Sequence, residues 1–309
     1  MSDLPAILQM SEDVASALKT GLPVVALEST VLTHGLPHPE NFSILNELEE
    51  IIREEDVIPA TVIVLDGTAH IGLDGEIKRE LELRLRQPEN FLKLARRDLA
   101  LAFARSDSGG TTVSATLKLA GMCGIEIFAT GGIGGVHRDW ESTFDISSDL
   151  RALAEIPIAV VSAGCKAILD IPATLEYLET LAIPVLGWKT DRFPQFYTRE
   201  SEHPIGKIDS AAGFASFWQR HIELDGRGVL IANPIPEKFS IPLQVVETGI
   251  QAAIEAARQH SIKGKALTPF LLDYLARQAK GGFIEANLAL LKNNALLGAK
   301  LAMELKKKG

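Results

Sequence analysis

Cysteine is nearly absent from this sequence of 309 residues: there are two, Cys123 and Cys165, both among small or apolar residues. A framework of disulfides is therefore not expected, and a reducing cytoplasm is the natural setting. Long apolar runs are also missing, since none reaches the roughly 18 residues of a membrane span. The N-terminus lacks a basic segment followed by a long apolar one, so we expect neither a signal peptide nor a membrane partner.

An excess of positive charge is the third thing the chain lacks. The formal net charge is −9 and the pI is about 5.4, so binding to nucleic acid or to an anionic membrane is not expected. A local basic site can still bind a phosphorylated small molecule. Hydrophobic residues make up 46% of the chain, which allows a large core. With no repeat, low-complexity tract or long linker, residues 1–309 are predicted to form a single catalytic α/β domain.

Short apolar runs alternate with segments of helical periodicity along the chain. Runs such as Val24–Leu27, residues 60–67, Ile125–Ala129 and Ile156–Val161 are typical of buried strands. Helices are predicted between them and at both ends, including residues 5–19 with Ser11 as N-cap, 268–278 and 283–307. This alternation predicts an α/β fold whose largely parallel sheet is covered by helices on both sides.

The most informative stretch runs from Phe128 to Asp170. Its two predicted strands end in Thr130-Gly131-Gly132 and Ser162-Ala163-Gly164, and ligands of open α/β sheets bind at such carboxyl ends. The string TGGIGG invites a dinucleotide interpretation, but His137 stands where a third glycine is needed and no acidic residue follows the next strand. We expect instead that these glycines let the backbone approach a sugar or a phosphate.

Lys166 is the candidate nucleophile. It follows Gly164 by two positions and is expected to begin an apolar helix, Ala167–Ile171. Desolvation and a helix N-terminus both favour the neutral amine that Schiff-base chemistry needs. A surface lysine at a helix start is the alternative. Cys165 is a rival nucleophile, although a small buried packing residue is the simpler interpretation.

Carboxylates cluster just upstream of Lys166. Asp139, Glu141, Asp145 and Asp149 lie within eleven residues, and Asp145 and Asp149 would share a face if this part were helical. Oxygen ligands without cysteine favour a hard cation such as Mg²⁺ or Mn²⁺. The alternative is that these acids complement a helix dipole.

Two further positions have competing interpretations. Glu28 ends the predicted strand Val24–Leu27, where it is either a cap or a general acid or base. The basic residues Lys93, Arg96 and Arg97 form either a solvated surface or a phosphate contact.

Several long strings resemble one family. These are ALESTVLTHG near the start, RRDL at 96–99, TGGIGGVHR, TFDISSDL, AGCKAILD, ANPIPE at 232–237 and TPFLL at 268–272. They occur in the order found in the pseudouridine-5′-phosphate glycosidase family, also called the indigoidine synthase A-like family, and the similarity covers about Pro23 to Ala302. It implies a three-layer α/β/α fold with a largely parallel or mixed central sheet, and a homotrimer.

The resemblance also implies an activity, the reversible cleavage of the C–C glycosidic bond of pseudouridine 5′-phosphate to uracil and ribose 5-phosphate. Lys166 resembles the imine-forming nucleophile, Glu28 the proton donor and Asp145 the ligand of a divalent ion, usually Mn²⁺. The residues that resemble substrate contacts are Lys93, Val113, Ser147, Ser148 and Asp149, to which we add Thr130, His137 and, for the uracil edge, Asn287.

A C-glycosidic bond has no heteroatom leaving group, so hydrolysis by two carboxylates is poorly suited to it. An imine on lysine supplies an electron sink, which explains a central lysine. Two alternatives stay open from the residues alone. One is a Schiff-base aldolase or lyase that acts on another sugar phosphate. The other is a ligand-binding protein without catalysis, against which the presence of Glu28, Asp145 and Lys166 argues.

Overall fold

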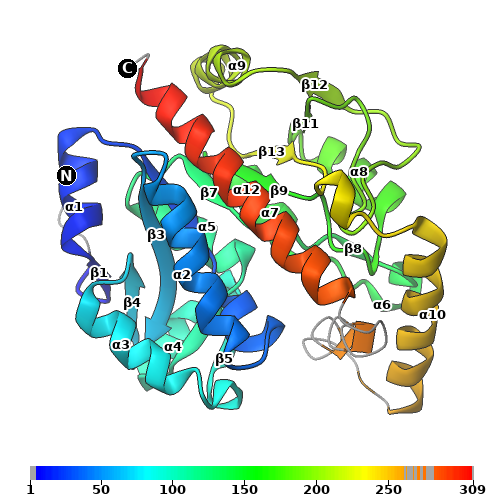
Figure 1. Ribbon diagram of the computed structural model, residues 1–309, viewed down its shortest axis with the longest axis horizontal. Coiled ribbons are helices and arrows are strands. Elements are labelled where there is room, and N and C mark those ends of the chain that lie inside the picture. Colours follow the sequence, from blue (N-terminus) through cyan, green and yellow to red (C-terminus); the bar gives the residue numbers. More distant parts are fainter. Residues whose placement is uncertain are drawn as a thin grey trace.

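The computed structural model describes residues 5–260, 262, 267, 270–271, 274–275 and 282–307. Most of the predicted helix 268–278, three of the five residues of the string TPFLL, and Lys308 lie outside the described residues. Within them, one large sheet organises the fold (Figure 1). Its main path runs, in spatial order, through β1 (Leu8–Met10), β4 (Thr68–Ile71), β3 (Ile58–Leu65), β2 (Val24–Leu27), β7 (Ile127–Ala129), β9 (Ala159–Ser162), β13 (Val229–Ala232), β11 (Val185–Trp188) and β12 (Gly206–Ile208).

The sheet is parallel from β3 to β12 and mixed at its other edge. Ala26 of β2 pairs with Ala60 of β3 and Phe128 of β7, and Phe128 pairs in turn with Val160 of β9. Strand β4 and the short β6 (Gly109–Thr111) run antiparallel to β3, and β6 also carries β5 (Leu92–Leu94). A separate antiparallel pair joins β8 (Val136–His137) and β10 (Leu169–Asp170).

Helices cover both faces of the sheet. In Figure 1, α2 (Glu40–Arg53) and α12 (Gly282–Lys306) cross in front of it, while α5 (Val113–Met122) and α7 (Ser148–Glu155) lie behind and pack against each other. The other helices are α1 (Glu12–Thr20), α3 (Gly75–Arg84), α4 (Leu99–Arg105), α6 (Trp140–Thr143), α8 (Ile171–Thr180), α9 (Ala211–Glu223) and α10 (Leu243–Gln259), with single turns at Val31–Gly35, Pro88–Asn90, Arg96–Asp98 and Glu237–Phe239. The predicted three-layer α/β/α architecture is confirmed.

Burial of the central strands explains their apolar sequences. Every residue of β2, β7, β9 and β13 is buried, as expected for parallel strands covered on both faces. The long helix α12 approaches this layer closely at Gly298, where a Cβ atom would lie 3.2 Å from Ala129 Cβ and 3.5 Å from Val25 Cγ1. A side chain there would need the helix or the sheet to move by a few tenths of an ångström.

The N-terminal segment differs from its prediction. Ser11 is the N-cap as expected, and its hydroxyl accepts from the amide of Val14. The residues before it form strand β1 instead of the first turns of a helix. Three residues are enough to pair with β4, so the helical periodicity expected from residue 5 begins in fact at Glu12.

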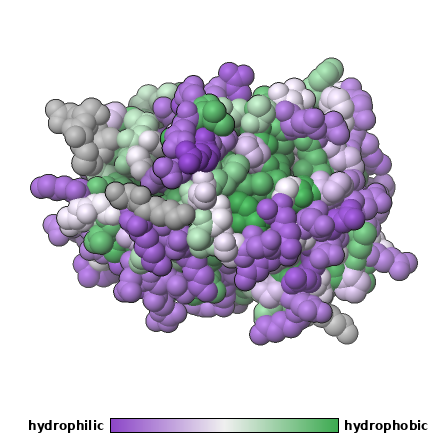
Figure 2. Space-filling model, turned by 90° about the horizontal axis from the view of Figure 1, so that it is seen from above, coloured by the Kyte–Doolittle hydropathy of each residue, from purple (hydrophilic) through white to green (hydrophobic). Residues whose placement is uncertain are grey.

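The two edges of the parallel strands have different surfaces. Figure 2 shows the face at the amino ends of the strands, where an apolar area lies among mainly hydrophilic residues. Leu22, just before β2, and Leu224, shortly before β13, are exposed apolar residues. Among the described helices, none is long and apolar enough to cross a membrane. The cavities described next lie at the carboxyl ends.

Candidate active site

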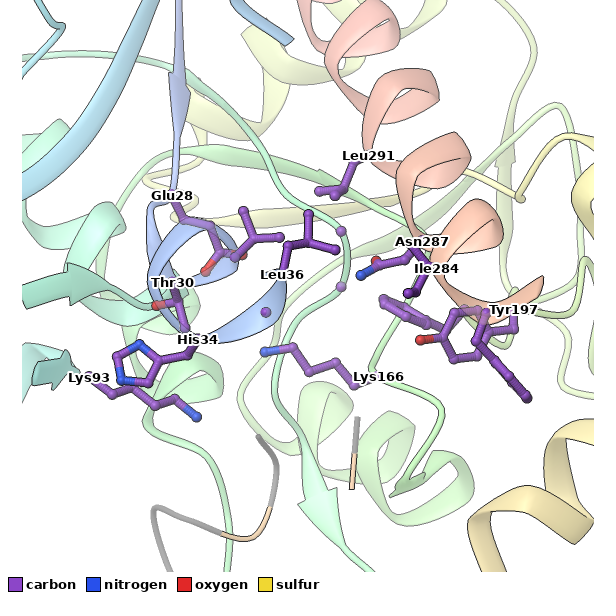
Figure 3. A pocket seen from close by; sticks show the side chains of 16 residues that line it. Glu28, Thr30, His34, Leu36, Lys93, Lys166, Tyr197, Ile284, Asn287 and Leu291 are labelled. Carbon is purple, nitrogen blue, oxygen red and sulfur yellow. The ribbon is translucent and has the colours of Figure 1, made fainter. Parts of the chain in front are cut away.

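Two adjoining pockets lie at the carboxyl ends of the strands, and Lys93 and Lys166 line both. We call the first the apolar pocket; besides Glu28, His34 and Asn287, it is lined by Leu36, Phe196, Tyr197, Phe283, Ile284 and Leu291 (Figure 3). We call the second the polar pocket; it is lined by Arg97, Asp98, His137, Asp145, Ser147, Ser148 and Asp149, among others. The sequence predicted this edge of the sheet, and most of the predicted residues meet here.

Glu28 directly follows β2, and its side chain lines the apolar pocket. Burial raises the pKa of its carboxyl group, and the opposing effects of Lys166, the Thr130 hydroxyl and Lys93 do not cancel the increase. The Thr130 hydroxyl donates a hydrogen bond to Glu28 Oε1. A carboxyl group of raised pKa that lines a cavity holds its proton to a higher pH than usual, which is what a general acid needs.

Lys166 lies in the loop after β9, and its ammonium group points into the cavity toward the side on which Glu28 lies (Figure 3). The prediction that it begins a helix is wrong. Residues 167–168 form a turn, Leu169 and Asp170 form β10, and α8 begins at Ile171. The Asp170 side chain caps α8 by accepting from the Ala173 amide at 2.9 Å. Asp followed by Ile-Pro is a stronger helix start than Cys-Lys-Ala, because it supplies both the cap and a proline in the first turn.

The loop that carries Lys166 is held on two sides. The Lys166 amide donates to the Ile133 carbonyl at 3.0 Å, which joins this loop to the glycine-rich turn after β7. Gly164 has a φ of +86°, and a Cβ atom there would lie 2.4 Å from the Pro194 carbonyl. The loop of residues 189–205 therefore packs against the site. Its aromatic residues Phe193 and Phe196 are buried, so it forms a wall of the site.

Asp149 is buried, and its carboxylate holds two segments together. Oδ1 accepts from the Ser114 amide in the first turn of α5, and Oδ2 accepts from the Gly134 amide, both at 2.9 Å. The expectation that Asp145 and Asp149 share a helical face is wrong, because α7 begins only at Ser148, with Ser147 as its N-cap. Asp145 precedes the helix, while Asp149 turns inward.

Asp145 is the carboxylate that a metal ion could reach in the polar pocket. Its side chain is 38% exposed, and Oδ2 lies 4.0 Å from His137 Nε2. Burial lowers the pKa of His137, so its imidazole favours the neutral form. No group of three or more His, Cys, Asp or Glu side chains among the described residues could hold a metal ion. With only this carboxylate of the described part of the chain in reach, a divalent ion would have to take most of its ligands from outside the protein.

The basic residues separate into different roles. Arg96 forms an ion pair with Glu155, whereas Lys93 and Arg97 line the polar pocket. His34, in the π-helical turn Val31–Gly35, was not predicted; its Nδ1 lies 2.7 Å from the Thr33 hydroxyl. Burial and the neighbouring Lys93 lower its pKa. The string ALESTVLTHG contained His34, but nothing in the sequence indicated that its ring would face the cavity.

The remaining predicted residues have mixed positions. Asn287 lies on α12 and lines the apolar pocket. Ser147 and Ser148 line the polar pocket. Thr130 and Val113 are buried and line neither of these pockets, so their side chains act behind the pocket surface.

Cys165, the rival nucleophile, is fully buried, and burial raises the pKa of its thiol to about 12. A thiolate is therefore not available next to Lys166 at neutral pH.

An α/β/α fold with a lysine and a half-buried carboxyl group on one cavity, at the carboxyl ends of its parallel strands, is the arrangement of an enzyme active site. The model of the indigoidine synthase A-like protein family matches residues 13–304, and the chain belongs to this family. It is 47% identical over 305 residues to the pseudouridine-5′-phosphate glycosidase of Caldanaerobacter subterraneus subsp. tengcongensis, covering 97% of both chains. It is 43% identical over 312 residues to that of Escherichia coli K12, covering 98% of both.

Two solved structures share the fold. The crystal structure of an indigoidine synthase A-like protein from Thermotoga maritima matches with a TM-score of 0.89 at 33% identity, covering 99% of both chains. The prealnumycin C-glycosynthase AlnA, solved in complex with ribulose 5-phosphate, matches with the same TM-score, identity and coverage. The predicted family is confirmed.

Proposed function

We propose that this protein is a pseudouridine-5′-phosphate glycosidase, which reversibly cleaves the C–C bond between uracil and ribose 5-phosphate. The observation that carries the proposal is the pairing of Lys166 with Glu28 on one cavity, an amine beside a carboxyl group of raised pKa (Figure 3). Curated relatives with 43–47% identity over nearly the whole chain bear this name.

The two pockets suggest how the substrate is oriented. The apolar pocket, with its aromatic walls and Asn287, suits a flat base that needs hydrogen bonds at one edge. The polar pocket offers Lys93, Arg97 and the hydroxyls of Ser147 and Ser148 to a phosphate. The sugar would then bridge the two, with its C1′ near Lys166, which lines both pockets.

The chemistry follows from that placement. The Lys166 amine bonds to C1′ as the bond from C1′ to the ring oxygen breaks, and the proton that the nitrogen loses goes to that oxygen. The nitrogen lone pair then drives cleavage of the bond from C1′ to uracil C5, which leaves an iminium at C1′. The proton of Glu28 goes to C5, and uracil leaves. Water adds to the iminium and releases ribose 5-phosphate from the lysine.

A Schiff-base aldolase or lyase on another sugar phosphate would use the same amine. The neighbour AlnA, a C-glycosynthase bound to ribulose 5-phosphate, supports both a pentose phosphate and C–C glycosidic chemistry for this fold. Release of uracil from pseudouridine 5′-phosphate separates the two functions, since an aldolase would not cleave the bond between the sugar and the base.

Three further features belong to the proposal. The first is Mn²⁺ at Asp145, with waters and the substrate as its other ligands; bound there, it would supply positive charge next to the phosphate. The second is a homotrimer, for which the family resemblance is the support. The third is a reducing cytoplasm, which agrees with the two buried cysteines, both of them free thiols.

The direct test is to incubate the purified protein with pseudouridine 5′-phosphate and Mn²⁺ and to measure uracil by chromatography. Uracil should appear in equal amount to ribose 5-phosphate, and uracil added to ribose 5-phosphate should form the nucleotide. A reaction that consumes other sugar phosphates but releases no uracil would support the aldolase instead.

A further inference from the structure

A chain of amide hydrogen bonds connects α12 to Glu28. The Asn294 side chain donates from Nδ2 to the Thr130 carbonyl at 2.8 Å, and the Thr130 hydroxyl donates to Glu28 Oε1. At its other end, Asn294 Oδ1 accepts from Asn233 Nδ2 at 2.9 Å. Asn233 follows β13, so three segments far apart in the sequence meet behind the apolar pocket.

Asn294 is an unusual residue for its place. It is fully buried in the middle of the long helix α12, where asparagine is a poor helix former. Burying an amide costs free energy unless its groups are bonded, and here both the nitrogen and the oxygen have partners. Asn294 lines neither of the two pockets, so it does not act by touching the substrate.

The segment that Asn294 holds needs a constraint. Thr130 is the last residue before Gly131 and Gly132, two residues with the widest backbone freedom. The Thr130 amide donates to the Val161 carbonyl at 3.0 Å and the Gly131 carbonyl accepts from the Ala163 amide at 2.9 Å, which leaves the Thr130 carbonyl itself to be held. The Asn294 bond holds this carbonyl, with a longer bond of 3.4 Å to the Gly131 carbonyl.

We propose that Asn294 is a positioning residue for the proton donor: it sets the Thr130 backbone so that the Thr130 hydroxyl is aimed at Glu28. This inference rests on the proposed function, because it assigns a purpose to the network only if Glu28 delivers a proton. Asn287, two turns earlier on the same helix, touches the apolar pocket, so α12 contributes to both the pocket wall and the acid behind it.

The effect on Glu28 has a definite sign. The Thr130 hydroxyl bonds to the charged carboxylate and lowers the pKa of Glu28, against a larger increase from burial. Lys166 and Lys93 also lower this pKa, and Asp149 raises it. Loss of the Asn294 bond lets the hydroxyl drift, which weakens the lowering effect. The alkaline limb of the kcat profile should then move to higher pH, because a general acid works in its protonated form.

The test compares Asn294→Leu with Asn293→Ala, its neighbour on α12. Asn293 donates to the Pro234 carbonyl at 3.1 Å and does not touch Thr130. Both variants are assayed for uracil release per folded enzyme over a range of pH. We expect Asn294→Leu to lose kcat about tenfold, the value of one hydrogen bond of about 1.4 kcal/mol, and to shift the alkaline limb upward. Asn293→Ala should keep the limb of the unmodified protein.

A double-mutant cycle with Thr130→Val tests whether Asn294 acts through Thr130. If Asn294 acts through Thr130, the double variant Asn294→Leu/Thr130→Val should lose no more kcat than Thr130→Val alone. Additive losses with an unshifted limb would overturn the inference and leave Asn294 as a packing residue. If Asn294→Leu does not fold, Asn233→Ala can replace it, because this change removes the hydrogen bond that orients the Asn294 amide. An alkaline limb that does not shift in Asn233→Ala would also overturn the inference. If the unmodified protein releases no uracil, the proposed function itself fails.

Discussion

Replacing Glu28 by glutamine should separate catalysis from stability. The amide keeps the shape and can still accept from the Thr130 hydroxyl, so the pocket should persist. It has no proton to deliver to C5, so kcat should fall by about 10²–10⁴-fold, or roughly 3–5 kcal/mol of barrier. Borohydride trapping should label Lys166 with the sugar phosphate in the unmodified protein and much less in Glu28→Gln, because the iminium that borohydride reduces forms only when the bond from C1′ to uracil C5 breaks.

The same change should stabilise the fold at neutral pH. Burial raises the pKa of Glu28 above its ordinary 4.5. Ionisation at pH 7 is therefore less favourable in the folded state than in the unfolded chain, which lowers the free energy of unfolding at that pH. Each tenfold change in the ionisation constant is about 1.4 kcal/mol. For a chain of this length that corresponds to about 2 °C in Tm. Glu28→Gln should therefore melt higher than the unmodified protein at pH 7, and the difference should vanish below pH 4.5, where both forms are neutral.

Glu49→Gln is the matched control. Glu49 is also buried, but it accepts from Lys78 at 2.6 Å and from the Thr61 hydroxyl at 2.8 Å, away from both pockets. Removing its charge breaks an ion pair, so this variant should lose stability and keep its turnover per folded enzyme. Normal turnover in Glu28→Gln would refute the role of Glu28 as acid. A lower Tm than the unmodified protein at pH 7 would refute the account of its burial.

The other predictions concern the nucleophile, the phosphate and the metal. Lys166→Ala should lose more than about 10³-fold in kcat, and Lys166→Arg should not recover it because a guanidinium stays protonated; uracil release and the mass of the borohydride-treated Lys166 peptide report both. Unphosphorylated pseudouridine should have a kcat/KM at least about 10²-fold below that of the nucleotide, and Lys93→Ala should narrow this gap. Chelation should abolish activity and Mn²⁺ should restore it better than Ca²⁺, with Asp145→Asn requiring more Mn²⁺; full activity of metal-free protein would contradict this.

The central strands of the sheet, β2, β7 and β9, were predictable from the sequence because they are buried on both faces. Val24–Leu27 was predicted with its observed bounds, and the strands before Thr130 and Lys166 were found within three residues. In an α/β chain, a short and continuous apolar run is typical of a parallel strand covered by helices on both sides. The short strands β1, β4, β5 and β6 at the mixed edge were missed. Strands β4 and β6 pair with β3, β1 pairs with β4 and β5 with β6, so their pairing depends on segments that only the folded chain brings together.

At the site, residue types were predicted better than their surroundings. Lys166 was expected at a helix start, but it lies in a loop ahead of β10. Asp145 and Asp149 would have shared a face if their segment were helical, but the helix begins at Ser148 and Asp149 accepts from the amides of Ser114 and Gly134. In both cases the chemistry was indicated by the residue and its neighbours, while the contacts depend on segments that only the folded chain brings together.

The helix α12 shows this dependence most clearly. It begins more than 250 positions after Glu28, yet it supplies Asn287 and Leu291 to the apolar pocket and Asn294 to the network behind it. From the sequence, Asn287 was expected at the uracil edge, but no role was assigned to Asn293 or Asn294. Two consecutive residues, Asn293 and Asn294, differ by about 100° around the helix axis. Because of that rotation, the Asn293 amide bonds to the Pro234 carbonyl and the Asn294 amide to the Thr130 carbonyl. Both asparagines lower the helix propensity of α12 equally, but only Asn294 is connected to Glu28.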